Sequence, residues 1–175
     1  MGMTASYRRI TDSELKQFLD DPQFALSFVG LLADDPFEFY QRLEAEGKRL
    51  DIQKEWQALH FLLTGEAADP GESEAPLPLR NAVMGGTETD CEATYGVVRY
   101  LTVQEVREVA EALGRVPEDD LKARYDSDEF VEAEIYANTE RDDDGFRALL
   151  NVHVDVAGFF KKAAKAGDAM LLSLD

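Results

Sequence analysis

The fold depends on one stretch of the chain, residues 50–65, which reads LDIQKEWQALHFLLTG. Asp51 can cap the first turn of a helix, and Gly65 can take the left-handed conformation that ends one. Four apolar residues fall on a single stripe at about 100° per residue: Ile52, Trp56, Leu59 and Leu63. We therefore predict a helix whose apolar side enters the core of the domain.

His60 lies about 60° from the centre of that stripe, at about 100° per residue, and one turn after Trp56. The last turn of the helix is apolar on nearly every side, so we expect it to end deep inside the domain. Histidine is the side chain whose charge changes most readily near neutral pH. His60 is therefore the first candidate for a functional residue.

Local signals place further elements on both sides of this helix. Capping boxes predict helices that start at Thr11 and Thr102, and alternation predicts a first strand around residues 3–8. Other predicted helices are Phe24 to Leu32, Asp35 to Gly47, Pro117 to Tyr125, and one starting at Ser127 that carries Phe130, Val131 and Glu134 on one face. Tyr95 to Leu101 reads as a strand. After a charged turn at 140–145, the tail reads strand (146–154), helix (155–163) and strand (169–174).

Together these elements predict a single α+β domain over residues 1–175, with a small mixed or antiparallel sheet and several packed helices. Residues 65–78 form a long acidic loop that carries Pro70, Gly71, Pro76 and Pro78. Loops of this length often serve as lids or binding segments. Because the loop leaves the helix directly beyond His60, a lid over that residue is geometrically possible.

Composition limits the partners. The chain has 36 acidic and 18 basic residues and a net charge of −18, which repels phosphate backbones and anionic lipids. We expect no nucleic-acid partner and no membrane association, and the apolar run from Phe24 to Ala33 is too short to span a bilayer. The single Cys91 and the absence of an apolar signal core near the N-terminus favour a cytoplasmic protein.

Several parts of the chain resemble the YfbM-like family of small bacterial proteins. They are Met1-Gly2-Met3, Leu50-Asp51-Ile52, Lys54, Trp56, Leu59-His60-Phe61, Leu63-Thr64-Gly65, Pro78-Leu79, Ala82-Val83, Glu132 and Glu134-Ile135-Tyr136. The resemblance extends in order over almost the whole chain. It implies a single-domain α+β fold of unknown function in a bacterial cytoplasm, and it implies no activity.

Catalytic and metal-binding motifs are weak. With only two histidines and no short-spaced pair of them, we predict no metal site, and nothing points to a cofactor. Cys91 lies between Asp90 and Glu92, whose negative charges disfavour the reactive thiolate. The chain has no Gly-x-Ser-x-Gly motif for a serine nucleophile. We therefore leave open whether the protein is an enzyme.

One group of side chains could still form a pocket. Its members are Asp51, Trp56, His60, Glu134 and Tyr136. If Glu134 is drawn into apolar surroundings it requires a partner, and His60 or Tyr136 could supply one. Glu134 and His60 would then be an acid and base pair. The alternative is a core histidine bonded to a backbone carbonyl, with Glu134 on a helix surface.

Two functions from different classes follow. The first is a non-enzymatic interaction module that binds an unknown, basic protein, in the manner of an immunity protein, because of the net charge. The second is a small-molecule-binding protein or hydrolase with a pocket around His60 under the loop 65–78. For the oligomeric state we expect a monomer or a weak homodimer through the apolar Phe24–Leu32 segment.

Overall fold

The computed structural model describes residues 2–69, 71–136 and 142–175. Its centre is an antiparallel sheet of five strands in the order β2-β1-β5-β4-β3. The strands are β1 (Ala5–Ile10), β2 (Arg49–Asp51), β3 (Thr87–Glu92), β4 (Val97–Leu101) and β5 (Ala169–Leu174). β1 pairs with β5 along its whole length, from Ala5 opposite Leu174 to Ile10 opposite Ala169. The α+β class and the antiparallel sheet are thus confirmed.

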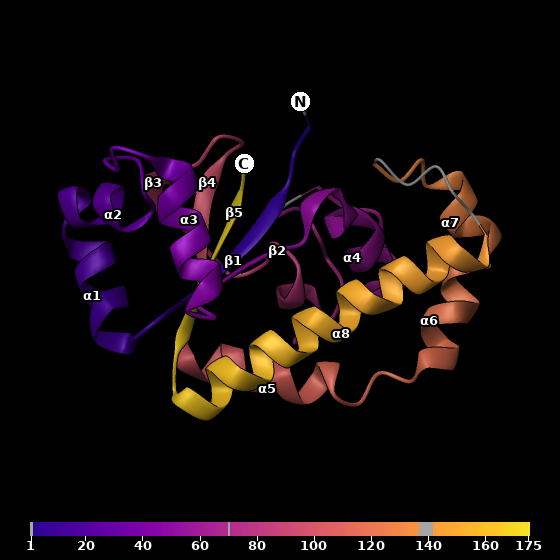
Figure 1. The fold of residues 1–175 in the computed structure, drawn as a ribbon. Coiled ribbons are helices and arrows are strands. Elements are labelled where there is room, and N and C mark those ends of the chain that lie inside the picture. Colours follow the sequence, from indigo (N-terminus) through magenta and orange to yellow (C-terminus); the bar gives the residue numbers. More distant parts are fainter. Residues whose placement is uncertain (1, 70, 137–141) are drawn as a thin grey trace.

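Helices pack on both faces of this sheet. They are α1 (Asp12–Asp20), α2 (Pro22–Phe28), α3 (Pro36–Ala45), α4 (Trp56–Thr64), α5 (Val103–Leu113), α6 (Glu118–Tyr125), α7 (Asp128–Glu132) and α8 (Asp143–Ala166). In Figure 1, α1 to α3 gather on the left of the sheet, whereas α4 to α8 lie below it and to its right.

The strand β5 shows how the two faces divide the core. Met170 and Leu172 belong to the larger cluster with α4, α5 and α8, whereas Ala169 and Leu171 belong to a smaller cluster with α1 and α2. Successive residues of a strand point to opposite faces, so the clusters lie on opposite sides of the sheet. We call them the inner and the outer cluster.

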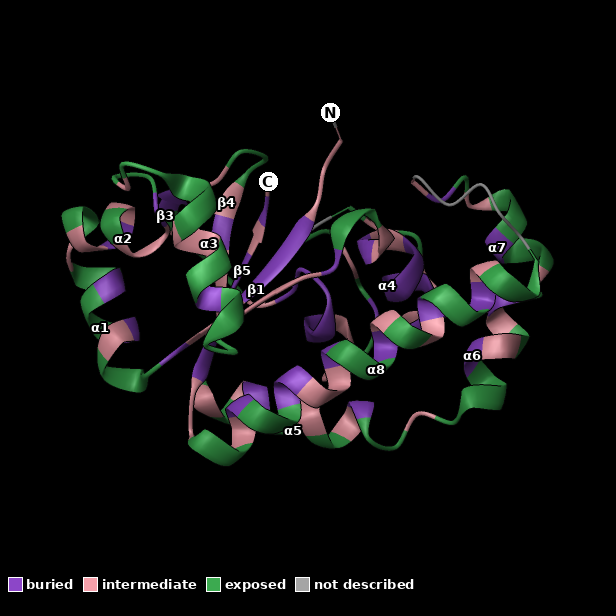
Figure 2. Cartoon of the chain, in the orientation of Figure 1, coloured by how far each residue is buried: buried purple, intermediate pink, exposed green. Residues whose placement is uncertain are grey.

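The helix α4 lies inside the inner cluster, as the sequence predicts. Trp56 is 2 % exposed, and in Figure 2 this helix is buried over almost its full length. Gly65 ends it with a φ of +77°. The start differs from the prediction, because a short 3-10 helix, Gln53–Glu55, comes first and Asp51 belongs to β2. Asp51 still accepts a hydrogen bond from the backbone N–H of Gln53 at 2.7 Å.

The predicted strand at 146–154 is wrong, because these residues belong to the long helix α8. Its buried residues recur every three or four positions, which is the helical spacing: Phe146, Leu149, His153, Val156, Phe160 and Ala163. The predicted strand also does not supply a buried face, since Val154 within it is 59 % exposed. Of the predicted charged turn, residues 140 and 141 lie outside the described part, Asp142 caps α8 and the rest begins the helix.

Three other boundaries also differ from the prediction. α2 ends at Phe28, ahead of Gly30 with a φ of +84°, so the predicted helix does not reach Leu32. Leu31 and Leu32 are each 58 % exposed. α7 ends at Glu132, before Glu134. The strands β2 and β3 were not predicted, because β2 is very short and β3 is mostly polar.

Candidate functional site

His60 is held on the buried side of α4, in the middle of the helix. The residue is 4 % exposed, and each ring nitrogen exposes less than 1 Å². Neither nitrogen has a hydrogen-bond partner among the described residues. A buried polar atom without a partner costs about 1–3 kcal/mol, so such atoms in a folded protein require an explanation.

A cavity of about 260 Å³ lies against this histidine. Trp56 and His60 form one wall, and the loop 65–78 contributes Ala68, Asp69, Gly71 and Ser73. The opposite wall consists of Arg80, Asn81, the segment from Val83 to Gly86, and Arg99. The cavity and the two unpartnered nitrogens together define the candidate site.

A tight turn forms part of the opposite wall. Met84 has a φ of +54°, a left-handed conformation that costs a non-glycine residue roughly 1–3 kcal/mol. Gly86, with a φ of +82°, lies so close to the backbone of Tyr100 that a Cβ would collide with its carbonyl. The side chain of Asn81 fixes the turn, because its Oδ1 accepts the backbone N–H of Gly86 at 3.0 Å. This wall is therefore a defined, strained structure.

Arg99 holds the turn from the side of β4. Its Nε donates to the carbonyl of Gly85 at 3.3 Å, and its Nη2 donates to the carbonyl of Gly86 at 3.2 Å. The third donor, Nη1, bonds Glu88 at 2.8 Å. Gly71 of the loop packs against this guanidinium so closely that a Cβ would lie 2.6 Å from Nη1. Arg99 thus joins the turn and the loop, and its charge is already paired.

Glu66 gives the loop its shape. Its carboxylate accepts hydrogen bonds from the Ser73 hydroxyl at 2.8 Å, from the Ala75 N–H at 3.0 Å and from the Glu74 N–H at 3.3 Å. These bonds close residues 66–75 into a ring. The loop therefore lies beside His60 as an organised segment, and Pro70 within it is outside the described residues.

Burial also sets the protonation of the site. Desolvation lowers the pKa of His60 below its ordinary value, and the negative charge of Glu66 opposes that shift. The pKa of Glu66 is itself lowered, first by the hydrogen bond from Ser73. The imidazole is therefore neutral at pH 7, with one ring nitrogen as a donor and the other as an acceptor.

Three of the predicted pocket residues come together in the structure. Trp56 and His60 line the cavity. Tyr136 lies behind Trp56, with the two ring centroids 5.8 Å apart, and its hydroxyl accepts the N–H of Met3 at 2.9 Å. The indole N–H of Trp56 donates to the carbonyl of Met3 at 3.3 Å.

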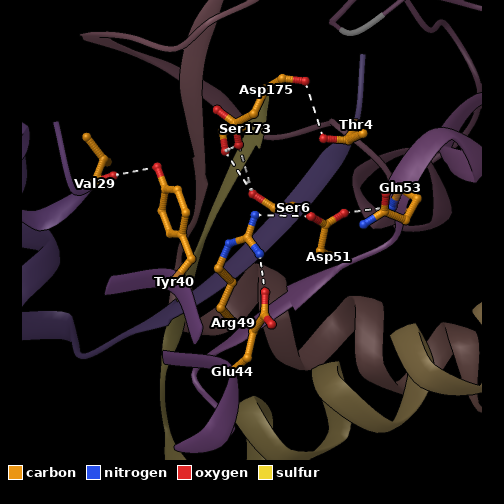
Figure 3. Close-up of polar contacts among 10 residues, drawn as sticks. All are labelled: Thr4, Ser6, Val29, Tyr40, Glu44, Arg49, Asp51, Gln53, Ser173 and Asp175. Atoms are coloured by element: carbon orange, nitrogen blue, oxygen red, sulfur yellow. Dashed lines mark hydrogen bonds and ion pairs between the residues drawn. The ribbon is translucent and has the colours of Figure 1, made fainter. Parts of the chain in front are cut away.

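The other two predicted residues lie elsewhere. Asp51 pairs with Arg49 at 3.3 Å, away from the cavity (Figure 3). Glu134 is exposed, has a φ of +49° and does not line the cavity. The acid and base pair of Glu134 and His60 is therefore not formed.

Four residues on the opposite wall were not predicted as site residues: Arg80, Asn81, Met84 and Arg99. The Gly85-Gly86 pair beside them was the one local signal, since paired glycines mark a tight turn. Among the described residues, no group of three or more histidine, cysteine or acidic side chains could hold a metal ion. No helix in the described part of the chain is long and apolar enough to cross a membrane.

The fold and the site define a single α+β domain with one histidine-lined cavity under a loop. The chain belongs to the family described as a domain of unknown function, DUF1877, whose model matches residues 1–173. It is 28 % identical to Protein YfbM from Escherichia coli K12 over 137 residues, which are 78 % of this chain and 74 % of that protein. This confirms the resemblance to the YfbM-like family.

The fold is also similar to a solved structure. The crystal structure of YfbM from Escherichia coli, described as a protein of unknown function, matches with a TM-score of 0.71. The match covers 98 % of this chain and 99 % of that one at 21 % identity. The likeness shows that the two proteins share a fold. The function therefore has to be inferred from the candidate site.

Proposed function

We propose that this protein binds a small polar molecule in the cavity beside His60. The observation that carries the proposal is the pair of ring nitrogens without a described partner, at the edge of a cavity of about 260 Å³. A ligand could supply the hydrogen bonds that the chain does not. Because each nitrogen exposes less than 1 Å², we expect the ring to be reached only after its surroundings shift, and the loop 65–78 is the candidate because it contributes to the cavity wall.

Binding is favoured over hydrolysis, because the cavity offers no activated nucleophile. The hydroxyl of Ser73 donates its proton to Glu66, so it is not hydrogen-bonded to His60 as a base. Cys91 lies in the outer cluster, and burial followed by the charge of Glu92 raises the pKa of its thiol. A nucleophile requires a base within hydrogen-bond reach. The interaction with a basic protein stays a prediction that depends on the net charge of −18.

Trp56 provides a direct test, because it is the single tryptophan of the chain and lines the cavity. We expect members of a panel of neutral and anionic metabolites to change its fluorescence in a saturable way. His60→Phe, which fills part of the cavity and removes both nitrogens, should abolish the change. His153→Phe on α8 is the matched control, since His153 is also buried but does not line the cavity.

Two results would count against the proposal. One is a panel in which no compound changes the fluorescence of the wild-type protein. The other is an equal response from both histidine variants while circular dichroism shows them folded, because the site would then lie elsewhere.

A further inference from the structure

The wall opposite His60 carries cations, although the whole chain is strongly acidic. Arg80 and Arg99 both line the cavity, whereas the net charge of the protein is −18. Asp69 is the one acidic residue among those that line it, and it is exposed on the loop. Since Arg99 is paired with Glu88, the charged groups that remain at the cavity are Arg80 and Asp69, in a protein of net charge −18.

The two arginines differ in their hydrogen bonds. Arg99 is committed to the carbonyls of Gly85 and Gly86 and to the carboxylate of Glu88. Arg80, on the short 3-10 helix Leu79–Ala82, is half-buried, and its guanidinium has no hydrogen bond or ion pair to any residue that the structure describes. One fork of donors at the cavity is thus free.

The neighbours of Arg80 are donors as well. Asn81 is buried, and its Oδ1 already accepts the N–H of Gly86, so the polar group that it has left is the Nδ2 amide. The neutral imidazole of His60 has one N–H, which becomes available only when the buried ring is uncovered. Carboxylate and phosphate oxygens accept from such groups, and an arginine fork binds them with two parallel hydrogen bonds.

We infer, on the basis of the proposed function, that the ligand of this cavity carries an oxyanion, a carboxylate or a phosphate, which Arg80 binds. The cavity of about 260 Å³ is small for a ligand pocket, so we expect the ligand to be a compact organic anion. The anion faces Arg80 and Asn81, and the remainder of the molecule reaches toward His60 and Trp56.

The test uses two probes of the oxyanion, inorganic phosphate and acetate, added to the ¹⁵N-labelled full chain at constant ionic strength. We expect saturable shifts of the Gly85 and Gly86 amides and of the Arg80 Nε–H signal. Arg80→Gln should weaken this binding roughly ten- to hundredfold, since a hydrogen bond to a charged group is lost. Arg107→Gln makes the same charge change at an exposed position on α5 and should leave it unchanged.

Arg80→Lys should bind with intermediate affinity, because it keeps the charge and loses the fork. The stronger of the two probes identifies the anion as phosphate or carboxylate. Acetamide, the neutral counterpart of acetate, should give no saturable shift in the wild-type protein. This last comparison requires no variant and holds even if Arg80→Gln does not fold.

Equal responses of Arg80→Gln and Arg107→Gln would overturn the inference, since the probes would then act as general ions. A different result would contradict the oxyanion without contradicting the proposed function. If neutral metabolites still bind at Trp56 in the wild-type protein and in Arg80→Gln while the anions do not, the cavity is a binding site and only the oxyanion is wrong.

Discussion

Two side chains with buried, unpartnered nitrogens lie on opposite sides of the sheet: the buried His60 on the inner side and the half-buried Arg8 on the outer side. Arg8 on β1 also has two buried nitrogens, Nε and Nη1, without a partner among the described residues. Its guanidinium lies 3.5 Å from the ring centroid of Phe28 and 5.5 Å from that of Phe39. Arg8 lines a smaller cavity of about 80 Å³, whereas His60 lies beside the cavity of about 260 Å³.

The difference follows from the chemistry of the two groups. Burial lowers the pKa of Arg8 to about 10, so the guanidinium stays charged at pH 7, and the carboxylates of Glu14 and Glu46 oppose the shift. The negative faces of aromatic rings suit a cation that cannot lose its proton. An imidazole can lose its proton, so His60 is tolerated as a neutral group. His60 therefore lacks hydrogen bonds that a ligand could supply, whereas aromatic rings of the protein itself stabilise Arg8.

The largest expected effect concerns the inner side. Trp56→Ala should lower the free energy of unfolding by about 3–5 kcal/mol, because a ring that is 2 % exposed leaves a large hole in the inner cluster. Phe37→Ala on α3 is the control. Its ring is 71 % exposed, so we expect a change within about 0.5 kcal/mol. Urea unfolding measures both, and a similar loss for the two variants would contradict the division between buried α4 and exposed α3.

The next effect is a dependence of stability on pH. Burial lowers the pKa of His60 in the folded state, so below about pH 6.5, the ordinary value for histidine, the unfolded chain takes up a proton that the folded protein refuses. Stability therefore falls as the pH drops below that value, by up to about 1.4 kcal/mol per pH unit for this group. Above it both states are neutral and the contribution disappears.

His60→Leu should reduce this slope, and at pH 8 it should leave the protein as stable or slightly more stable, since it replaces an unpartnered polar ring by an apolar one. The pKa of His153 is lowered by burial as well, so His153→Leu should reduce the slope independently. Urea unfolding from pH 5 to pH 8 gives the slopes. An unchanged slope in His60→Leu would show that folding does not lower the pKa of His60.

The smallest effect concerns Arg8. Phe28→Leu keeps an apolar side chain but removes the aromatic face under the guanidinium, and it should cost about 1 kcal/mol beyond any change in packing. Phe24→Leu is the matched control, because that ring contacts Phe28 at 5.2 Å and is not one of the rings that stack on Arg8. Thermal unfolding of the two variants should differ by that amount. Equal losses would mean that the aromatic stacking stabilises Arg8 no more than ordinary packing does.

Much of the fold follows from local sequence signals. Both capping boxes form as predicted, with Thr11 and Glu14 at the start of α1 and Thr102 and Glu105 at the start of α5. Such signals involve residues three apart, so they are independent of the rest of the chain. α8 was divided wrongly because a short, largely apolar run such as 146–154 does not by itself distinguish a strand from part of a helix, and only the packing of the whole helix decides which residues are buried.

The sequence predicted only the part of the site that α4 contributes. The periodicity of α4 identified Trp56 and His60, because both belong to a helix with a regular apolar face. Arg80 and Arg99 come from a 3-10 helix and a strand and meet only through tertiary packing, so no spacing in the sequence relates them. Glu134 was assigned to a helix that ends two residues earlier, which moved its side chain to the surface.

The closed ring that Glu66 makes with Ser73, Glu74 and Ala75 has a mechanical consequence. Because these described residues are tied to one carboxylate, we expect access to the imidazole to come from rotation at the two ends of the loop. Its first end is Gly65, which has no Cβ to restrict that rotation. The hydrogen bonds of Glu66 already restrict the loop before a ligand arrives. Ordering the loop over a bound ligand should therefore cost little additional conformational entropy.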